Sequence, residues 1–122
     1  MKMVREKLTM IKKQGINVYG SFIIGLPTET KEEINQTIKF ALSIPLNGAS
    51  FHTFVPYPRT YFYDKYIKNN SVEWESFSSH NLNPIVINKN ISKNYLLYKQ
   101  TEAYIRFYSK RNIIKSFHRF VK

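Results

Sequence analysis

The segment from Gly20 to Thr30 constrains the fold of this chain more than any other. It runs Gly20-Ser-Phe-Ile-Ile-Gly25-Leu-Pro-Thr-Glu29-Thr30, so an apolar run stops at a glycine and a proline fixes the turn that follows. Thr30 and Glu33 have the spacing of a capping box, in which each side chain satisfies a backbone donor of the other residue. The segment therefore predicts a strand, a tight turn and a helix, and such junctions hold the ligands of many α/β proteins.

Hydrophobic spacing predicts a βαβ unit with further helices on both sides. The expected strands are residues 17–25 and 49–55, and the expected helices are residues 2–14, 31–44 and 60–68 and a segment that begins after Ser92. One helix between two strands implies parallel pairing and a right-handed crossover. Phe22 and Ile23 make the first strand apolar on two faces, which a two-stranded parallel sheet cannot cover. We therefore expect a slice of a larger barrel or sheet whose other strands lie upstream.

The helix after Ser92 is expected to be amphipathic, basic and aromatic. One helical face is expected to contain Leu97, Thr101, Tyr104, Ile105 and Tyr108, and a second apolar set follows at Ile113, Phe117, Phe120 and Val121. These faces could lie on a partner, on the missing barrel or on a membrane surface, and packing on the barrel is the ordinary interpretation.

Composition excludes several kinds of chemistry. The chain has 122 residues and no cysteine, which excludes disulfides, thiolate zinc sites and any cysteine-held iron–sulfur cluster within it. The net charge of +11 comes from 19 Lys and Arg against 8 Asp and Glu, and such a surface attracts nucleic acid, anionic lipid or an acidic partner. A lysine-rich composition with a solvated face is the favoured interpretation over a dedicated polyanion site. Neither a membrane span nor a signal peptide is visible, so we expect a cytoplasmic location.

The order and spacing of several short motifs resemble the back half of a radical SAM enzyme. The motifs are Gly15-Ile-Asn-Val18, Ser21-Phe-Ile-Ile-Gly25-Leu-Pro-Thr-Glu29-Thr30, Thr37-Ile38-Lys-Phe-Ala41 and Phe54-Val-Pro56-Tyr-Pro58-Arg-Thr60. The resemblance is closest to the branch that carries a cobalamin-binding domain in front of the barrel. It continues into Ala103-Tyr-Ile-Arg-Phe-Tyr108, which is similar to the tail helix of that branch.

This resemblance implies S-adenosylmethionine and a [4Fe-4S] cluster as cofactors of the full-length enzyme, with cobalamin as a further cofactor of the branch. In the family, three cysteines hold a cluster that reductively cleaves S-adenosylmethionine to a 5′-deoxyadenosyl radical, which is used for methyl transfer or rearrangement. Those cysteines are absent here, so the chain alone is expected to bind none of these cofactors. It is then a fragment, a truncated product or a remnant that has lost the chemistry. The expected partners are the missing N-terminal half of the barrel and a small-molecule substrate.

By resemblance, the strand that ends at Gly25 supports the adenine of S-adenosylmethionine. Ile23 stands where the family has an apolar residue against the ring, and Glu29 matches the family's glutamate after the turn. Thr28 replaces the more usual glycine, and a β-branched residue disfavours a positive φ. A plain tight turn, with Glu29 favoured by the dipole of the following helix, is the structural alternative. The expected cofactor-binding residues are Ser21, Ile23, Gly25, Leu26, Pro27 and Glu29.

The second strand ends in a loop that is similar to the family's Pro-x-Pro-Gly-Thr loop. Arg59 replaces the glycine, which leaves the shape of the loop open. Its guanidinium either binds a carboxylate or phosphate of a substrate or faces solvent. His52 points either into the barrel lumen or to the helix layer, and a lone strand histidine is more often a packed residue than an acid, base or ligand. The expected substrate-side residues are His52, Pro56, Tyr57, Pro58, Arg59 and Thr60.

The sequence thus predicts an α/β fold, a partial (β/α) barrel slice with parallel strands followed by a C-terminal helical tail. Residues 1–68 are expected to form the barrel part, residues 69–91 an irregular connector anchored by Trp74 and Phe77, and residues 92–122 the tail. No catalytic residue is predicted, and His80 and His118 are too isolated to indicate a metal site.

A second hypothesis is a basic, aromatic module that binds nucleic acid or another partner. It depends on stacking by tail aromatics beside Arg106, Lys110 and Arg111.

Overall fold

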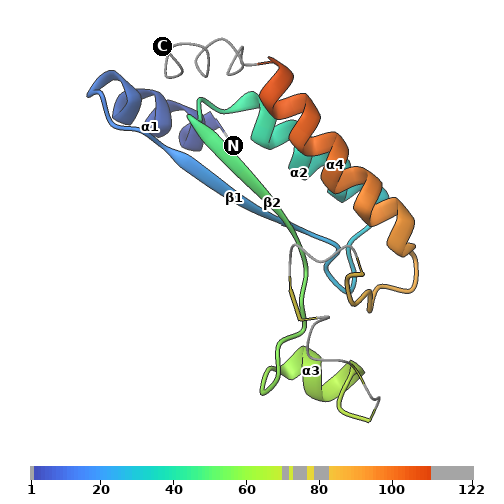
Figure 1. The fold of residues 1–122 in the computed structure, drawn as a ribbon. Helices are drawn as coiled ribbons and strands as arrows, with labels where there is room; N and C mark the ends of the chain where they lie inside the picture. The colour runs from blue at the N-terminus through green and yellow to red at the C-terminus, as the bar shows by residue number, and fades with distance from the viewer. Residues whose placement is uncertain (1, 70–71, 73–76, 79–82, 111–122) are drawn as a thin grey trace, which may run out of the picture.

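The computed structural model describes residues 2–69, 72, 77–78 and 83–110 of the chain. The elements in chain order are α1 (Lys2–Lys13), β1 (Tyr19–Ile24), α2 (Lys31–Ser43), β2 (Gly48–Thr53), α3 (Tyr61–Tyr66) and α4 (Lys93–Lys110). β1 and β2 pair in parallel, and α2 and α4 lie side by side on one face of them (Figure 1). The α/β class, the parallel strands and the C-terminal helix are therefore as predicted.

Local sequence determines where these elements begin and end. Thr30 is the N-cap of α2 and forms the predicted capping box, because its hydroxyl accepts from the Glu33 amide while the Glu33 carboxylate accepts from the Thr30 amide. Gly15 ends the turn after α1 with a φ of 77°. Asn47 prolongs the pairing of the strands, since its amide donates to Val18 and its side chain accepts from Val18.

The core lies between the sheet and the pair of helices. Phe51 of β2 is fully buried, stacks on its register partner Phe22 with ring centroids 5.4 Å apart, and meets Phe107 of α4 edge to face. α2 contributes Ile34, Ile38 and Ala41, which are spaced for one face of a helix. The same cluster includes Leu96 and Ala103 of α4.

The predicted face of the last helix is partly wrong. The buried stripe of α4 is formed by Leu96, Ala103 and Phe107, whereas Ile105 is 60% exposed. Tyr104 and Tyr108 lie at the margin of the buried stripe. Helical spacing defines several stripes that differ by a rotation of the helix, and only the contacts with the sheet select one of them. The second apolar set at Ile113, Phe117, Phe120 and Val121 lies outside the described residues, as do Arg111 and His118.

One face of the sheet is covered by helices and the other is open among the described residues. Gly20, Phe22 and Ile24 of β1 face the helices, while Tyr19, Ser21 and Ile23 alternate to the other side and are exposed. Ser50 and His52 of β2 are the register partners of Ser21 and Ile23 and share this open face. The apolar second face predicted for β1 is therefore present.

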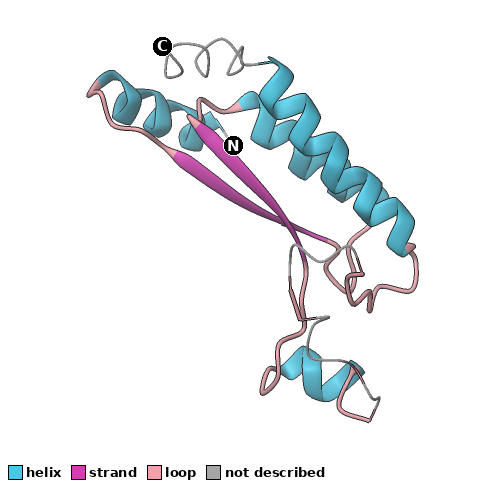
Figure 2. Cartoon of the chain, in the orientation of Figure 1, coloured by secondary structure: helices cyan, strands magenta, loops and turns pink. Residues whose placement is uncertain are grey.

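The connector between α3 and α4 has no helix or strand among its described residues (Figure 2). Trp74 and His80 lie outside the described residues. Phe77 does pack, since its ring lies 5.9 Å from that of Tyr63 in α3.

Candidate functional site

The turn between β1 and α2 is held by Glu29. Its Oε2 accepts hydrogen bonds from the Gly25 amide at 2.5 Å and the Leu26 amide at 3.1 Å. Glu29 is only 8% exposed, and burial raises the pKa of its carboxyl although the two amides act in the opposite direction. Glu29 precedes the N-cap Thr30 and therefore lies outside the first turn of α2. Its position is explained by the hydrogen bonds that it accepts from the turn, and not by the predicted interaction with the helix dipole.

Asn88 locks the same turn from a distant part of the chain. Its Nδ2 donates to the carbonyls of Leu26 and Glu29, both at 2.7 Å, and Asn88 is 4% exposed. Its Oδ1 accepts from the Asn90 amide at 2.9 Å, which fixes the orientation of the side-chain amide. Sequence reasoning missed Asn88 as part of the site. An asparagine in a polar loop indicates a turn, but nothing in the sequence indicates a partner about sixty residues away.

Position 25 requires glycine because of its backbone conformation and the packing of the core. Its φ is 86°, a region that side chains disfavour, and an added Cβ would lie 2.8 Å from Cδ2 of Leu96. Leu96 belongs to α4 on the helix side of the sheet. A substitution at Gly25 would therefore disturb the core before it affected any ligand. Thr28 does not have a positive φ, as its β-branched side chain predicted.

Residues from both predicted groups meet in a cavity on the open face of the sheet. The cavity has a volume of about 380 Å³ and is lined by Ser21, Ile23, His52, Thr53, Phe54, Val55 and Tyr57. Ile23 is 52% exposed and offers an apolar surface. Nε2 of the half-buried His52 lies 2.9 Å from Oγ of Ser50, so His52 faces the open side and not the helix layer. The cavity lies at the carboxyl ends of two parallel strands, where α/β proteins place their ligands.

The other predicted cofactor residues lie elsewhere around the turn. Leu26 and Glu29 border a different groove of about 350 Å³ that runs beside α2 with Glu33 and Phe40. Pro27 is half-buried in the turn itself. The structure thus brings Ser21 and Ile23 together with His52 and Tyr57, and it gives Gly25, Pro27 and Glu29 the role of shaping the end of the strand.

The loop after β2 keeps a glycine-like conformation despite its arginine. Arg59 has a φ of 67°, and it is the one non-glycine residue with a positive φ in the part of the chain that the structure describes. The side chain of Arg59 is exposed. Thr60 caps α3 by accepting from the Tyr63 amide, and its hydroxyl donates to the Tyr57 carbonyl at 2.6 Å. Pro56 is fully buried and Pro58 half-buried, so this loop is anchored on both sides of Tyr57.

The described residues offer no cluster of three His, Asp or Glu side chains that could hold a metal ion, and the sequence has no cysteine.

Across residues 2–69 and 83–110, no helix has both the length and the apolar character that crossing a bilayer requires.

Three curated proteins are similar to this chain. An uncharacterized methyltransferase from Pyrococcus horikoshii is 34% identical over 106 residues, which cover 84% of this chain and 23% of that protein. A bacteriochlorophyllide d C-8(2)-methyltransferase from Chlorobaculum tepidum is 25% identical over 84% of this chain and 23% of its own length. An anaerobic magnesium-protoporphyrin IX monomethyl ester cyclase from Cereibacter sphaeroides is 28% identical over 88% of this chain and 17% of its own length.

The chain thus spans less than a quarter of the length of the relatives it matches. No family model matches the chain. No solved structure matches it either. The three relatives support a relationship to radical SAM enzymes, as the motifs indicated, without distinguishing the cobalamin-binding branch.

Proposed function

We propose that this chain is the C-terminal part of the catalytic barrel of a longer radical SAM enzyme, and that it supplies one wall of the pocket for S-adenosylmethionine. The observation that carries the proposal is the cavity on the open face. It joins Ser21 and Ile23, expected beside the adenine, to His52 and Tyr57, expected beside the substrate. It lies at the strand ends where barrel enzymes assemble their sites.

The lining of the cavity fits a flat, apolar ring. Ile23, Phe54 and Tyr57 supply apolar surface, while Ser21 and His52 supply polar groups at the same face. None of these residues can hold the iron–sulfur cluster, because the sequence has no cysteine that could supply a thiolate ligand. The chemistry that the bound cofactors would supply is the 5′-deoxyadenosyl radical, and the share of this chain is to bind and orient.

We infer methyl transfer as the favoured reaction class, since two of the three relatives are named methyltransferases. Rearrangement is the second class that the family resemblance allows. The cobalamin-binding branch remains part of the proposal on the strength of the Ala103-Tyr-Ile-Arg-Phe-Tyr108 motif. Arg59, exposed at the loop after β2, would meet a carboxylate or phosphate of the substrate. We keep the cytoplasm as the proposed location, because a reducible cluster needs a reducing compartment.

The nucleic-acid hypothesis has weaker support. The hydroxyls of Tyr104 and Tyr108 bond to the backbone of β2, so these rings are engaged by the sheet. Arg106 donates to Glu102 at 2.9 Å. A nucleic-acid module would need affinity that falls steeply with salt and a slope that shrinks on substitution of Arg106 or Lys110.

The experiment that tests the proposed function begins with the gene. We expect a continuous reading frame upstream of Met1 that encodes a Cys-x3-Cys-x2-Cys motif. The longer product should gain an iron–sulfur absorbance on anaerobic reconstitution and form 5′-deoxyadenosine from S-adenosylmethionine. If the upstream reading frame encodes no such motif, the chain is a remnant and the proposed function is wrong.

A matched control is the 122-residue chain itself, treated in the same way. It has no residue that can hold the cluster, so it should give neither a reproducible absorbance nor any 5′-deoxyadenosine. Because the open face of its sheet is apolar, it should also aggregate or fold poorly. Product formation by this chain alone would overturn the assignment.

A further inference from the structure

Aromatic side chains continue the lining of the open-face cavity onto α3. Phe54, in the wall of the cavity, meets Phe62 of α3 edge to face with ring centroids 5.2 Å apart, and Tyr61 meets Phe62 at 5.4 Å. Tyr57 of the cavity is 49% exposed, and Tyr61 is 66% exposed. α3 lies beyond the carboxyl ends of the two strands (Figure 1). The cavity therefore borders an aromatic surface with two accessible tyrosines, which we call the tyrosine platform.

Both residues of the platform are held in place by their surroundings. The Tyr57 carbonyl accepts from the Thr60 hydroxyl at 2.6 Å, and the fully buried Pro56 anchors the chain on its other side. The Tyr61 hydroxyl accepts from Nζ of Lys65 at 3.1 Å, and the same ammonium lies 5.3 Å from the centroid of the Tyr61 ring. Tyrosine has few rotatable bonds, so a ring that is already held loses little conformational entropy on binding. Exposed rings of this kind are typical of recognition surfaces.

Two cations flank the tyrosine platform. Arg59 is exposed in the loop between its two residues, and Lys65 is exposed one turn after the second of them. Neither cation has a carboxylate partner in the part of the chain that the structure describes, whereas Lys68 pairs with Asp64 at 3.8 Å. Cations without such partners, placed beside exposed aromatic rings, attract an anion whose body can stack on the rings.

This combination of groups selects among anionic ligands. Aromatic faces favour a flat ring system over an alkyl chain, since paired rings gain more than the area that they bury. One guanidinium and one ammonium group suit one or two carboxylates. A nucleic-acid strand would instead need cations along its whole backbone, and the exposed Asp64 interrupts the cations of α3. The ligand that fits best is a flat polycyclic acid.

We propose that Tyr57, Arg59, Tyr61 and Lys65 bind the acidic edge of a flat polycyclic substrate whose other end enters the cavity. The inference rests on the proposed function for the reaction, because S-adenosylmethionine is proposed to lie beside Ile23 in the same cavity. The carboxylates of the substrate then lie at α3. The carbon that reacts lies in the part of the ring system that is farthest from them, so the two cations determine which edge of the substrate faces the radical.

Two fluorescent probes, pyrene-1-carboxylate and pyrene-1-carboxamide, test this site in the longer product. They share one flat ring system and differ in charge. The carboxylate should bind about threefold to tenfold more tightly than the amide at low salt. Arg59→Gln with Lys65→Gln should weaken binding of the carboxylate alone and abolish this preference. Tyr57→Leu with Tyr61→Leu should weaken binding of both probes about fivefold or more, because leucine keeps apolar area but cannot stack.

Tyr98→Leu and Lys68→Gln are the matched controls. Tyr98 is a 63% exposed tyrosine of α4, and Lys68 is the exposed lysine that pairs with Asp64. Both variants should bind the two probes as the wild type does. No binding of the carboxylate, equal binding of the two probes, or undiminished binding by the double variants would overturn the proposal. Displacement of the carboxylate by a single-stranded oligonucleotide would also overturn it, because the surface would then bind polyanions.

The titration uses neither the iron–sulfur cluster nor S-adenosylmethionine, so it can be made whether or not the upstream reading frame encodes the cysteine motif. Formation of 5′-deoxyadenosine by a product that does not bind pyrene-1-carboxylate would contradict the substrate site alone. Binding with the expected preference, in a product that forms no 5′-deoxyadenosine, would support the site and contradict the proposed function.

Discussion

Two residues in the loops at the carboxyl ends of the strands are energetically unfavourable. Arg59 is unfavourable in its backbone conformation, and Glu29 is unfavourable as a buried carboxylate. Arg59 has a left-handed backbone where the related loop has glycine. Glu29 is a buried carboxylate whose pKa is raised by desolvation while it accepts from two amides of the turn. Glu29 holds the turn after β1 through these two hydrogen bonds, and Arg59 lies in the loop after β2.

The strain at Arg59 can be measured by two substitutions. Glycine accepts a φ of 67° without a steric cost, whereas alanine retains the clash of a Cβ. Arg59→Gly should therefore be more stable than Arg59→Ala by about 1 kcal/mol in urea unfolding. Unfolding is measured in the longer product, here and for the variants below, because the 122-residue chain alone is expected to fold poorly. Equal stability of the two variants would mean that the loop relaxes to another conformation when the arginine is removed.

Glu29 should make the protein relatively more stable in acid. Its raised pKa means that the folded state takes up the proton before the unfolded state does, so its contribution to stability rises as pH falls through the raised pKa to the ordinary value of about 4.5. Glu29→Gln should lose this gain, and its free energy of unfolding relative to wild type should fall between about pH 7 and about pH 4. A difference between Glu29→Gln and wild type that stays constant over this range would contradict the role of the buried carboxyl.

At the scale of elements, the turn between β1 and α2 depends on a clamp from the connector. Asn88 donates to two carbonyls of this turn, and a donor is required there. Asn88→Ala should cost about 2 kcal/mol because two buried acceptors lose their partner. Asn88→Asp keeps the size but turns carboxylate oxygens toward the carbonyls, so it should cost more. A cost for Asn88→Asp below that for Asn88→Ala, measured by urea unfolding near neutral pH, would contradict the clamp.

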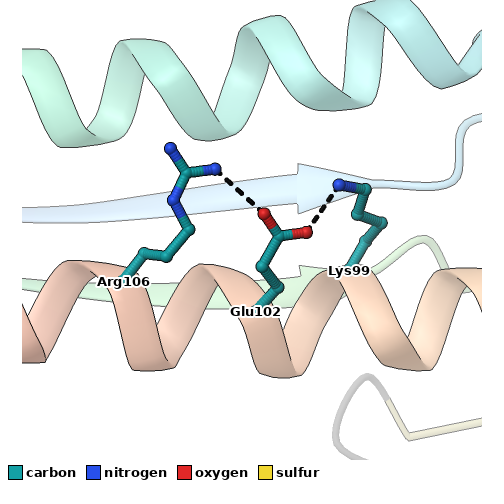
Figure 3. A network of polar contacts seen from close by, with 3 residues as sticks. All are labelled: Lys99, Glu102 and Arg106. Atoms are coloured by element: carbon teal, nitrogen blue, oxygen red, sulfur yellow. Dashed lines mark hydrogen bonds and ion pairs between the residues drawn. The ribbon is translucent and has the colours of Figure 1, made fainter.

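α4 carries a small, partly buried ionic network. Glu102 accepts from Lys99 at 2.5 Å and from Arg106 at 2.9 Å, and Figure 3 shows the carboxylate between the two cations. The hydrogen bond from Lys99 is the main cause that lowers the pKa of Glu102, so its contribution to stability is present above the ordinary value of about 4.5 and is lost as pH falls through the lowered pKa.

Glu102→Gln should therefore cost about 0.5 kcal/mol near neutral pH, and the difference from wild type should shrink in acid. Its trend with pH is opposite to that of Glu29→Gln, so one series of unfolding measurements separates the two carboxylates. A cost that persists unchanged in acid would show that Glu102 acts through packing.

Local patterns predicted what depends on neighbours along the chain, and they failed where distant segments decide. The capping box of Thr30 and the parallel pairing of the two strands follow from patterns along the chain. The rotation of α4, the contacts of Asn88 and the hydrogen bonds from α4 to β2 depend on residues more than forty positions apart in sequence, which no local pattern contains. These bonds involve Gln100, Tyr104 and Tyr108. The same distinction between local patterns and distant contacts applies to the residues of the candidate site. Ile23 was expected at the site from the family resemblance, whereas its position beside His52 required the register of the two strands.

At the scale of the whole molecule, the sheet has one covered face, one covered edge and an open apolar face that bears the cavity. Parallel sheets are usually covered on both faces. The proposed completion is the upstream part of the enzyme, and it places Ile23 beside the adenine of S-adenosylmethionine. Substitutions at Gly25 cannot test this placement, because an added side chain would first collide with Leu96.

Binding of S-adenosylmethionine to Ile23→Asn and Tyr19→Asn variants of the longer product is the measurement that decides. Both residues lie on the open face of β1, Ile23 at the carboxyl end and Tyr19 at the amino end. With folding confirmed for each variant, Ile23→Asn should weaken binding at least about tenfold, which corresponds to about 1.4 kcal/mol, and Tyr19→Asn should leave it unchanged. Unchanged binding in Ile23→Asn, or equal losses in the two variants, would show that the carboxyl end of β1 does not border the cofactor.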